Sequence, residues 1–296
     1  NSHTTLLLFS SRGKVYWLKT YEIPEASRAA RGRPLVNLLP LDEGEFITTM
    51  LPVDEYTEGH FIFMATAGGT VKKTPLEQFS RPRSVGLIAL DLDEGDTLIS
   101  ASITDGNREV MLFSDGGKVT RFKESDVRAM GRTARGVRGM RLAEGQKLIS
   151  MLIPEEGSQI LTASERGYGK RTEIGEFPEY KRGGQGVIAM VSNERNGKLV
   201  GAVQVLDGEE IMLISDQGTL VRTRVGEVSS LGRNTQGVTL IKLAKDEKLV
   251  GLERVQEPSE EELEEGEEGV VVEGDEVVDT GNAEQAGDEA VEPEAE

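Results

Sequence analysis

The chain repeats one unit five times, and every copy carries two glycines at matching positions. The first glycine follows an apolar run, as in LLLFSSRG, VMLFSDGG and IMLISDQG; these turn glycines are Gly13, Gly69, Gly117, Gly167 and Gly218. The second glycines lie 19, 17, 19, 19 and 19 residues further on, at Gly32, Gly86, Gly136, Gly186 and Gly237. A fixed period of about 50 residues indicates a repeat architecture.

Each copy reads as four short strands. In the third copy these are VMLFS, KVTRF, GVRGMRL from Gly136, and KLISMLI, all rich in Val, Ile, Leu or Phe. We expect the first two to form a hairpin, because glycine adopts the positive φ of a tight turn without a Cβ clash. No stretch of helical length shows a 3.6-residue period, which argues against a helical solenoid. The pattern predicts an all-β, propeller-like array of repeated four-stranded blades.

The charge distribution separates a body from a tail. Residues 256–296 hold 18 acidic residues and no Lys or Arg, which leaves 52 − 18 = 34 acidic residues against all 34 Lys and Arg in residues 1–255. A segment so acidic and so poor in apolar residues is predicted to be disordered. We therefore predict a folded domain over residues 1–255 and a disordered acidic tail over 256–296. The predicted repeats are about 4–53, 60–104, 108–154, 158–206 and 209–255.

Two basic columns run through the repeats. Four residues after the turn glycine stand Trp17, Lys73, Arg121, Arg171 and Arg222. Four residues before the second glycine stand Arg28, Pro82, Arg132, Arg182 and Arg233, and Pro82 lies between Arg81 and Arg83. In a radial array a repeated position becomes a band around one edge, which suits the phosphate track of a duplex. The predicted DNA-binding residues are these cations together with Arg31, Arg33, Arg135 and Lys181.

The first column has a competing interpretation. Side chains alternate along a strand, so its members share a face with the apolar residues two positions earlier, such as Val71 and Val119. Either the cation emerges where the strand leaves the core, or a bulge turns it outward, or it pairs with Glu and Asp of a neighbouring blade. The second column lies in Gly-rich loops, which are rarely buried.

The aromatic content favours double-stranded over single-stranded nucleic acid. Aromatic residues make up 5% of the chain and do not follow the register of the basic columns, whereas proteins that bind single strands usually stack bases on aromatic rings. Arginines in glycine loops without a recognition helix predict weak sequence preference, strong salt dependence and a preference for DNA that bends easily.

Other motifs carry no chemistry. His3 and His60 have no plausible catalytic partner. The acidic cluster at Asp91, Asp93, Glu94 and Asp96 reads AEGQ, NERNGK or KDEK in other copies, which favours a solvated loop over a metal site. Gly116-Gly117-Lys118 is followed by Val where a phosphate loop needs Ser or Thr. We predict no catalytic residue, no metal site and no cofactor site in this chain.

The composition also bears on location. The chain has no cysteine, which fits a reducing compartment. Its longest apolar runs are too short to span a bilayer, and no charged-then-apolar leader precedes the first repeat. We expect a cytoplasmic protein without a membrane segment.

Four long segments resemble a known family. They are SSRGKVYWLKTYEIPEASRAARGRPLVNLLPL, FKESDVRAMGRTARGVRGMRL, GYGKRTEIGEFPEYKRGGQGV and GTLVRTRVGEVSSLGRNTQGVTLIKL, and they are similar to the C-terminal domain of the bacterial DNA gyrase A subunit. The resemblance covers roughly residues 4 to 255, in the same repeat register. It implies a six-bladed β-pinwheel, with strands exchanged between blades, that wraps duplex DNA on a basic rim to support ATP-dependent negative supercoiling.

The resemblance also implies what this chain leaves to other parts. The family's Q-R/K-R-G-G-R/K-G box belongs to a first blade, which is expected upstream of Asn1. Copy four comes closest with Tyr180 to Gly186, YKRGGQG, and departs at the first and sixth positions. The family's active-site tyrosine lies in another domain, and ATP and Mg²⁺ are used elsewhere in the holoenzyme. The implied partners are double-stranded DNA, the strand-passage core of the same subunit and the gyrase B subunit in an A2B2 assembly.

The acidic tail is expected to modulate wrapping and partly inhibit it, because carboxylates tethered to a basic rim compete with phosphate. Two alternative functions stay open. The nearest is the C-terminal domain of the topoisomerase IV A subunit, which binds DNA with less wrapping. The alternative from another class is a propeller scaffold whose basic columns bind acidic protein partners.

Overall fold

The structure is a computed structural model that describes residues 3–27 and 30–255. The chain divides into two units, residues 1–256 and 257–296, and the first is described below. The predicted acidic tail lies outside the described residues. In the described part, nineteen strands form five antiparallel sheets, four of them with four strands and one with three. The predicted all-β, propeller-like array of blades is confirmed.

The first two strands of each copy form the predicted hairpin. These pairs are β1 (Thr5–Ser10) with β2 (Lys14–Lys19), β4 (Phe61–Thr66) with β5 (Thr70–Pro75), β8 (Glu109–Ser114) with β9 (Lys118–Lys123), β12 (Gln159–Ser164) with β13 (Tyr168–Glu173), and β16 (Glu210–Ser215) with β17 (Leu220–Arg224). The turn glycine has a positive φ in all five copies. The hairpins therefore form where the glycine pattern placed them.

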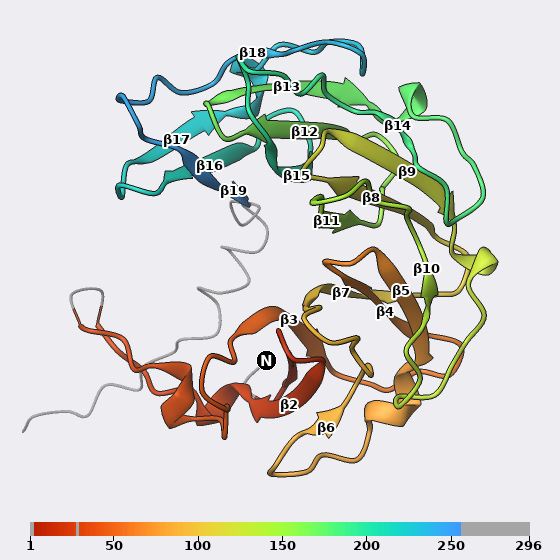
Figure 1. The fold of residues 1–296 in the computed structure, drawn as a ribbon. Coiled ribbons are helices and arrows are strands. Elements are labelled where there is room, and N and C mark those ends of the chain that lie inside the picture. The colour runs from red at the N-terminus through yellow and green to blue at the C-terminus, as the bar shows by residue number, and fades with distance from the viewer. Residues whose placement is uncertain (1–2, 28–29, 256–296) are drawn as a thin grey trace, which may run out of the picture. The chain divides into compact units, whose positions relative to one another are not determined.

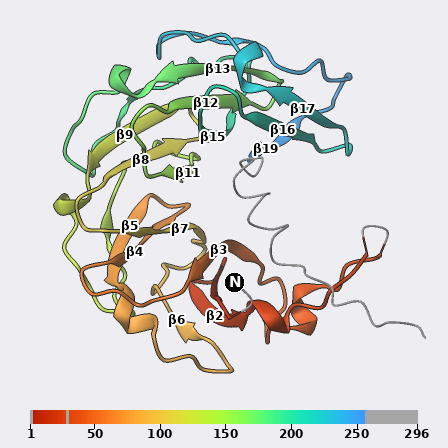
Figure 2. The ribbon, with the colours of Figure 1, turned by 180° about the vertical axis from the view of Figure 1, so that it is seen from behind.

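The last strand of each copy lies on the inner side of its blade. These strands are β3 (Ile47–Val53), β7 (Leu98–Thr104), β11 (Leu148–Leu152), β15 (Leu199–Val205) and β19 (Leu249–Val255). Each pairs with the first strand of its own copy, and consecutive inner strands pack against one another from β3 to β19. The five blades accordingly follow one another in chain order around a curve, as Figures 1 and 2 show from opposite sides.

The third strand of a copy joins the preceding blade. The outer strands β6 (Leu87–Ile88), β10 (Val137–Arg138), β14 (Val187–Ile188) and β18 (Val238–Thr239) pair with β2, β5, β9 and β13. Each four-stranded blade thus combines three strands of one copy with one strand of the next, which is the strand exchange that the resemblance implied. The prediction of a third strand of five to seven residues is wrong, because this segment pairs over two residues only.

The two ends of the array depart from this pattern. Among the described residues, blade five has three strands, ordered β17-β16-β19. The strand predicted from Gly32 is absent, and residues Leu35–Asn37 form the 3-10 helix η2 instead. Gly32 has no preceding copy in this chain to pair with, and Pro34 cannot donate a ladder hydrogen bond. The other 3-10 helices follow the hairpins: η1 (Thr20–Glu22), η3 (Leu76–Phe79), η4 (Glu124–Asp126), η5 (Ile174–Glu176) and η6 (Val225–Glu227).

Both repeated glycines lie where consecutive copies meet. The carbonyl of Gly69 accepts hydrogen bonds from the N–H groups of Gly139 and Met140, at 2.8 and 3.1 Å. A Cβ on Gly69 would lie 2.6 Å from the Met140 carbonyl oxygen, and one on Gly136 would lie 2.4 Å from that of Val71. Because neither position has room for a side chain, the two glycines permit the strand exchange.

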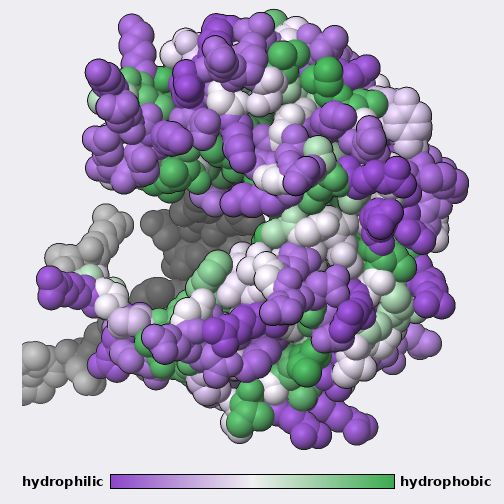
Figure 3. Space-filling model, in the orientation of Figure 1, coloured by the Kyte–Doolittle hydropathy of each residue, from purple (hydrophilic) through white to green (hydrophobic). Residues whose placement is uncertain are grey.

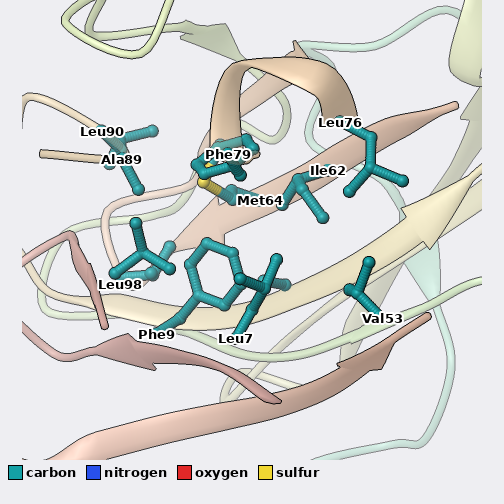
Figure 4. Close-up of a cluster of buried hydrophobic side chains, with 12 residues drawn as sticks. Leu7, Phe9, Val53, Ile62, Met64, Leu76, Phe79, Ala89, Leu90 and Leu98 are labelled. Carbon is teal, nitrogen blue, oxygen red and sulfur yellow. The ribbon is translucent and has the colours of Figure 1, made fainter. Parts of the chain in front are cut away.

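The apolar core lies between the blades, under a surface with many hydrophilic side chains (Figure 3). Figure 4 shows one cluster, in which Leu7 and Phe9 of blade one face Ile62 and Met64 of blade two. Phe79, on η3, stands edge-on to Phe9 with ring centroids 5.9 Å apart. The strand pattern therefore buries its apolar face against the next blade, which holds consecutive blades together.

Candidate nucleic-acid interface

The first basic column lies between blades. Lys73, on β5, is only 6% exposed. Its ammonium lies 3.4 Å from the carbonyl oxygen and 3.9 Å from a carboxylate oxygen of Glu124, at the start of η4 in the next copy. Trp17 holds the equivalent position in copy one, where its indole N–H donates to the Phe79 carbonyl at 2.9 Å. In copies one and two this position therefore joins the hairpin to the 3-10 helix of the following copy.

Arg121 and Arg171 make the same connection. The Arg121 guanidinium donates to the carbonyls of Ile174 and Phe177, both at 3.0 Å, and pairs with Glu109 at 2.6 Å. Arg171 donates to the Val228 carbonyl at 2.7 Å, and its side chain is 12% exposed.

The structure thus corrects the first column of the sequence prediction. Lys73, Arg121 and Arg171 stabilise blade junctions and do not form an exposed band. Arg222, on β17, pairs with Glu210 on the neighbouring strand. The alternative of pairing with Glu and Asp of a neighbouring blade describes Lys73, which pairs with Glu124, whereas Arg121 and Arg222 pair with glutamates of their own hairpins.

The second column lies along the outer edges of consecutive blades. Arg132, Arg182 and Arg233 are half-buried. Each donates to a carbonyl on the outer strand that the preceding copy contributes: Arg132 to Ile88 on β6 at 3.3 Å, Arg182 to Arg138 on β10 at 3.0 Å and Arg233 to Ile188 on β14 at 3.2 Å. A guanidinium has five N–H donors, and among the described residues Arg132 and Arg233 each use one of them in a side-chain hydrogen bond, which leaves the others for a ligand.

Two buried lysines hold the loops that carry Arg132 and Arg233. Lys72 is fully buried, and its ammonium donates to the carbonyls of Ala89 at 2.7 Å, Ala134 at 3.0 Å and Arg132. Burial lowers the pKa of Lys72 to about 8, and the nearby Arg132 charge adds to this effect.

Lys170 has the same role in blade four. It donates to the carbonyls of Gly232 at 2.7 Å and Arg233 at 2.6 Å, and to the Thr235 hydroxyl at 3.0 Å. Burial lowers its pKa to about 8 as well. Carbonyl groups of both loops thus point inward to an ammonium, and the loops are fixed from below.

The remaining predicted cations are exposed. Arg31, Arg33, Arg81 and Arg83 are all exposed, whereas Arg28 lies outside the described residues. Arg135 is exposed but pairs with Asp91 at 3.0 Å and Asp93 at 3.1 Å, which raises its pKa. Lys181 pairs with Asp126 at 2.8 Å, which likewise raises its pKa. These acidic partners reduce the positive field at this part of the rim.

Sequence reasoning missed Arg138, an exposed cation on the outer strand β10. The equivalent positions hold Ile88, Ile188 and Thr239, so no basic column marks this site. The feature that could have identified Arg138 is its place as the second residue of a short outer strand, where its side chain is exposed. Arg128, exposed in the same loop as Arg132, was missed for the same reason.

Known proteins share this repeat pattern and this arrangement of blades. The sequence model of the family described as DNA gyrase C-terminal domain, beta-propeller, matches residues 4–54, 60–105, 108–155, 158–205 and 209–256. The chain belongs to this gyrase C-terminal domain family. The DNA gyrase A subunit of Pseudomonas aeruginosa is 68% identical over 314 residues, which cover 90% of this chain and 34% of the relative.

Further relatives agree with this membership. The DNA gyrase A subunit of Escherichia coli K12 is 56% identical over 278 residues, covering 94% of this chain and 32% of the relative. This gyrase C-terminal domain therefore spans about a third of the length of these type II topoisomerase subunits.

Two solved structures show the same fold. The C-terminal domain of DNA topoisomerase IV has a TM-score of 0.83 at 26% identity, covering 91% of this chain and 85% of the other. A DNA gyrase A C-terminal domain has a TM-score of 0.74 at 30% identity, covering 86% and 83%.

The described residues of this gyrase C-terminal domain include neither a candidate metal-binding group nor a candidate membrane-spanning helix. In the described part of the chain, no group of three or more His, Cys, Asp or Glu is placed to hold a metal ion. Asp91 and Asp93 of the acidic cluster bind Arg135 instead. No helix among the described residues is long and apolar enough to cross a membrane.

Proposed function

We propose that this gyrase C-terminal domain binds duplex DNA along its outer edge and bends the duplex around consecutive blades. The observation that carries this proposal is the repeated bridge from Arg132, Arg182 and Arg233 to the outer strand that the preceding copy contributes. Cations repeated from blade to blade follow a curve, and a duplex that contacts them all must bend. The exposed Arg81, Arg83 and Arg138 add charge along the same edge.

The chemistry of this edge suits the phosphate backbone. Arginines in glycine-containing loops donate hydrogen bonds to phosphate oxygens and release condensed counterions, without reading base edges. Binding is therefore largely independent of sequence. In the full enzyme, the wrapped DNA presents a segment to the strand-passage core of the same subunit, and the A2B2 assembly with the gyrase B subunit introduces negative supercoils using ATP. The fragment itself needs no cofactor, and the enzyme acts in the cytoplasm.

One further observation favours a second candidate. The topoisomerase IV domain gives a higher TM-score than the gyrase A domain, although the gyrase A relatives are far more similar in sequence. A topoisomerase IV domain would bind DNA with less bending. The amount of bending, measured by energy transfer between dyes at the ends of a duplex, separates the two candidates.

The direct test reverses the second column. Changing Arg132, Arg182 and Arg233 to Glu is expected to weaken duplex binding by at least about a hundredfold at low salt, because three attractive charges become repulsive. Binding is measured by fluorescence anisotropy, and folding by circular dichroism. Undiminished binding by the folded variant contradicts the proposal.

A second variant gives the same test with less risk of misfolding. Arg81→Glu with Arg83→Glu changes two exposed side chains that make no ion pair or side-chain hydrogen bond with any described residue, so the fold is expected to survive. We expect a loss of roughly tenfold or more in affinity. A protein scaffold for acidic partners would instead show weak duplex binding in the unaltered domain.

A further inference from the structure

The turns that precede the inner strands change charge along the array. In copies one and two they read LDEGE (41–45) and DLDEGD (91–96), with three and four acidic residues and no basic one. In copies three, four and five they read RLAEGQK (141–147), VSNERNGK (191–198) and KLAKDEK (242–248), in which basic residues outnumber acidic ones by one. This face of the domain is acidic at its N-terminal end and basic at its C-terminal end.

A basic cavity of about 750 Å³ lies at the C-terminal end of this face. Its lining combines the hairpin turn of blade four with the turns of copies four and five, and includes Arg166, Arg195, Lys242 and Lys248. The two acidic residues in the lining are Asp246 and Glu247, so the formal charge of the lining is 4 − 2 = +2. The surface over blades four and five in Figure 3 is largely hydrophilic.

The charges in this cavity differ in how they are used. Glu247 accepts hydrogen bonds from the hydroxyls of Ser215 and Thr219, at 2.5 and 2.6 Å, which lowers its pKa. Lys248 lies 3.6 Å from Glu165. Arg166 and Lys242, by contrast, are exposed and have no ion pair or side-chain hydrogen bond with any described residue. These two cations are available to a ligand.

Arg195, in the same lining, is held in place by two contacts. Its guanidinium carbon lies 4.3 Å from the centre of the Tyr168 ring, and it donates to the Gln236 side chain at 3.0 Å. Gln236 is the residue before the second glycine, where copy three has Arg135. In copy three, Arg135 beside the second glycine is neutralised by Asp91 and Asp93 in the turn of copy two. Between copies four and five the arrangement is reversed, because the turn supplies Arg195 and the position beside the second glycine supplies the neutral Gln236.

We propose that this cavity binds a phosphodiester group of duplex DNA, so that the DNA path crosses from the outer edge onto the turns of copies four and five. Guanidinium groups donate to phosphate oxygens in a bidentate manner, and a lysine adds a mobile point charge. The acidic turns of copies one and two exclude the duplex from the same face at the other end of the array. This inference rests on the proposed function, because it extends the contacts of the same ligand.

The test removes the two available cations and measures, from the salt dependence of binding, how many phosphates they neutralise. Arg166→Gln with Lys242→Gln is expected to reduce the slope of log K against log salt by about 1.8, since each phosphate contributes about 0.9. The matched control is Arg12→Gln with Lys14→Gln. Arg12 is the repeat equivalent of Arg166, and both control cations already pair with Asp42, at 3.6 and 2.8 Å. An equal change in slope for the two variants overturns the proposal.

A second readout locates the DNA without relying on affinity. The chain has no cysteine, so Lys242→Cys and Arg12→Cys each give one labelling site for a photoreactive crosslinker. We expect a crosslink to the duplex from position 242 and none from position 12. No crosslink from position 242, in a protein that still binds DNA, shows that the cavity assignment is wrong while the rim stands.

The remaining alternative is a small anion. Titration of the DNA-free domain with inorganic pyrophosphate, followed by calorimetry, tests it directly. Pyrophosphate binding that depends on Arg166 and Lys242, together with an unchanged salt slope for DNA, assigns the cavity to a free phosphate compound and overturns the DNA proposal. If changing Arg132, Arg182 and Arg233 to Glu abolishes DNA binding while the cavity variant keeps the affinity and salt slope of the unaltered domain, the cavity proposal is wrong and the proposed function stands.

Discussion

At the scale of single residues, a cation's type says little about where it lies. Lys72 and Lys73 are adjacent on β5, and both side chains are directed into the protein, Lys72 under a rim loop and Lys73 at a blade junction. The position of Lys72 holds Lys170 in copy four, but Thr120 in copy three and Tyr16 in copy one. The buried ammonium groups of Lys72 and Lys170 therefore hold the loops of Arg132 and Arg233.

The buried ammonium groups should give a distinct pH dependence. The folded pKa of about 8 for Lys72 lies below its ordinary value of 10.5. Between these pH values the unfolded chain binds more protons than the folded one, so the free energy of unfolding rises with pH. The rise is roughly 3 kcal/mol for a shift of this size. Urea unfolding between pH 7 and the ordinary lysine value of 10.5 is expected to show a flatter pH profile in Lys72→Met.

The control for this experiment is an exposed lysine. Lys147→Met, in the turn of copy three, should leave the pH profile of the unaltered domain unchanged, because Lys147 is exposed. Identical profiles for the unaltered domain and Lys72→Met would show that the ammonium does not sense burial. Comparing the two variants at each pH cancels the contribution of all other titrating groups.

At the scale of the elements, side chains of the first column connect the hairpins of copies one to four to the next copy. Arg121 binds two carbonyls of the η5 region in addition to Glu109, across the junction between blades three and four. Carbonyls at the end of a short helix lack a full set of partners within it, and a side chain from the neighbouring blade supplies donors to them here. A cation in this place contributes to stability, and its charge is already neutralised by Glu109.

Replacing Arg121 should separate stability from DNA binding. Arg121→Met removes a donor from two carbonyls and leaves a partly buried carboxylate unpaired, which should lower the free energy of unfolding by about 2–4 kcal/mol. Thermal unfolding measures this loss. The salt slope of duplex binding, measured below the melting range, should not change. Lys123→Met, which removes a more exposed pair with Glu179 at 3.7 Å, is the control and should cost little. A reduced salt slope for Arg121→Met would return Arg121 to the DNA interface.

The sequence predicted the local elements well and their exchange between copies only through the family resemblance. The hairpins and inner strands follow from glycines and apolar runs, which are local signals. The pairing of β10 with β5 depends on a two-residue contact between copies, and no periodicity reports it. The partners of Arg121 do not follow from the sequence, because alternation along a strand gives the face of a side chain but not the carbonyls that it meets. Arg138 escaped because its repeat equivalents are not basic.

At the scale of the whole molecule, the excess negative charge is confined to one segment at the C-terminal end of the sequence. Residues 1–255 balance 34 acidic residues with 34 Lys and Arg, and residues 256–296 carry the whole net charge of −18. Within the body, the same balance is achieved locally by pairs such as Arg135 with Asp91 and Asp93, which leave other rim cations available. A duplex and the tail are both polyanions, so they compete for those cations.

Removing residues 256–296 should therefore strengthen duplex binding, most at low salt. A tethered polyanion acts at millimolar effective concentration, and its attraction to the rim weakens as the Debye length falls from about 30 Å at 0.01 M salt to about 10 Å at 0.1 M. We expect a gain of about tenfold in affinity at low salt that shrinks as salt rises, measured by anisotropy over a salt series. A tail with its Glu and Asp changed to Gln and Asn should behave as the truncated chain does, whereas a scrambled tail of unchanged composition should inhibit as the natural one does. Inhibition by the neutral tail would show that bulk, not charge, limits DNA binding.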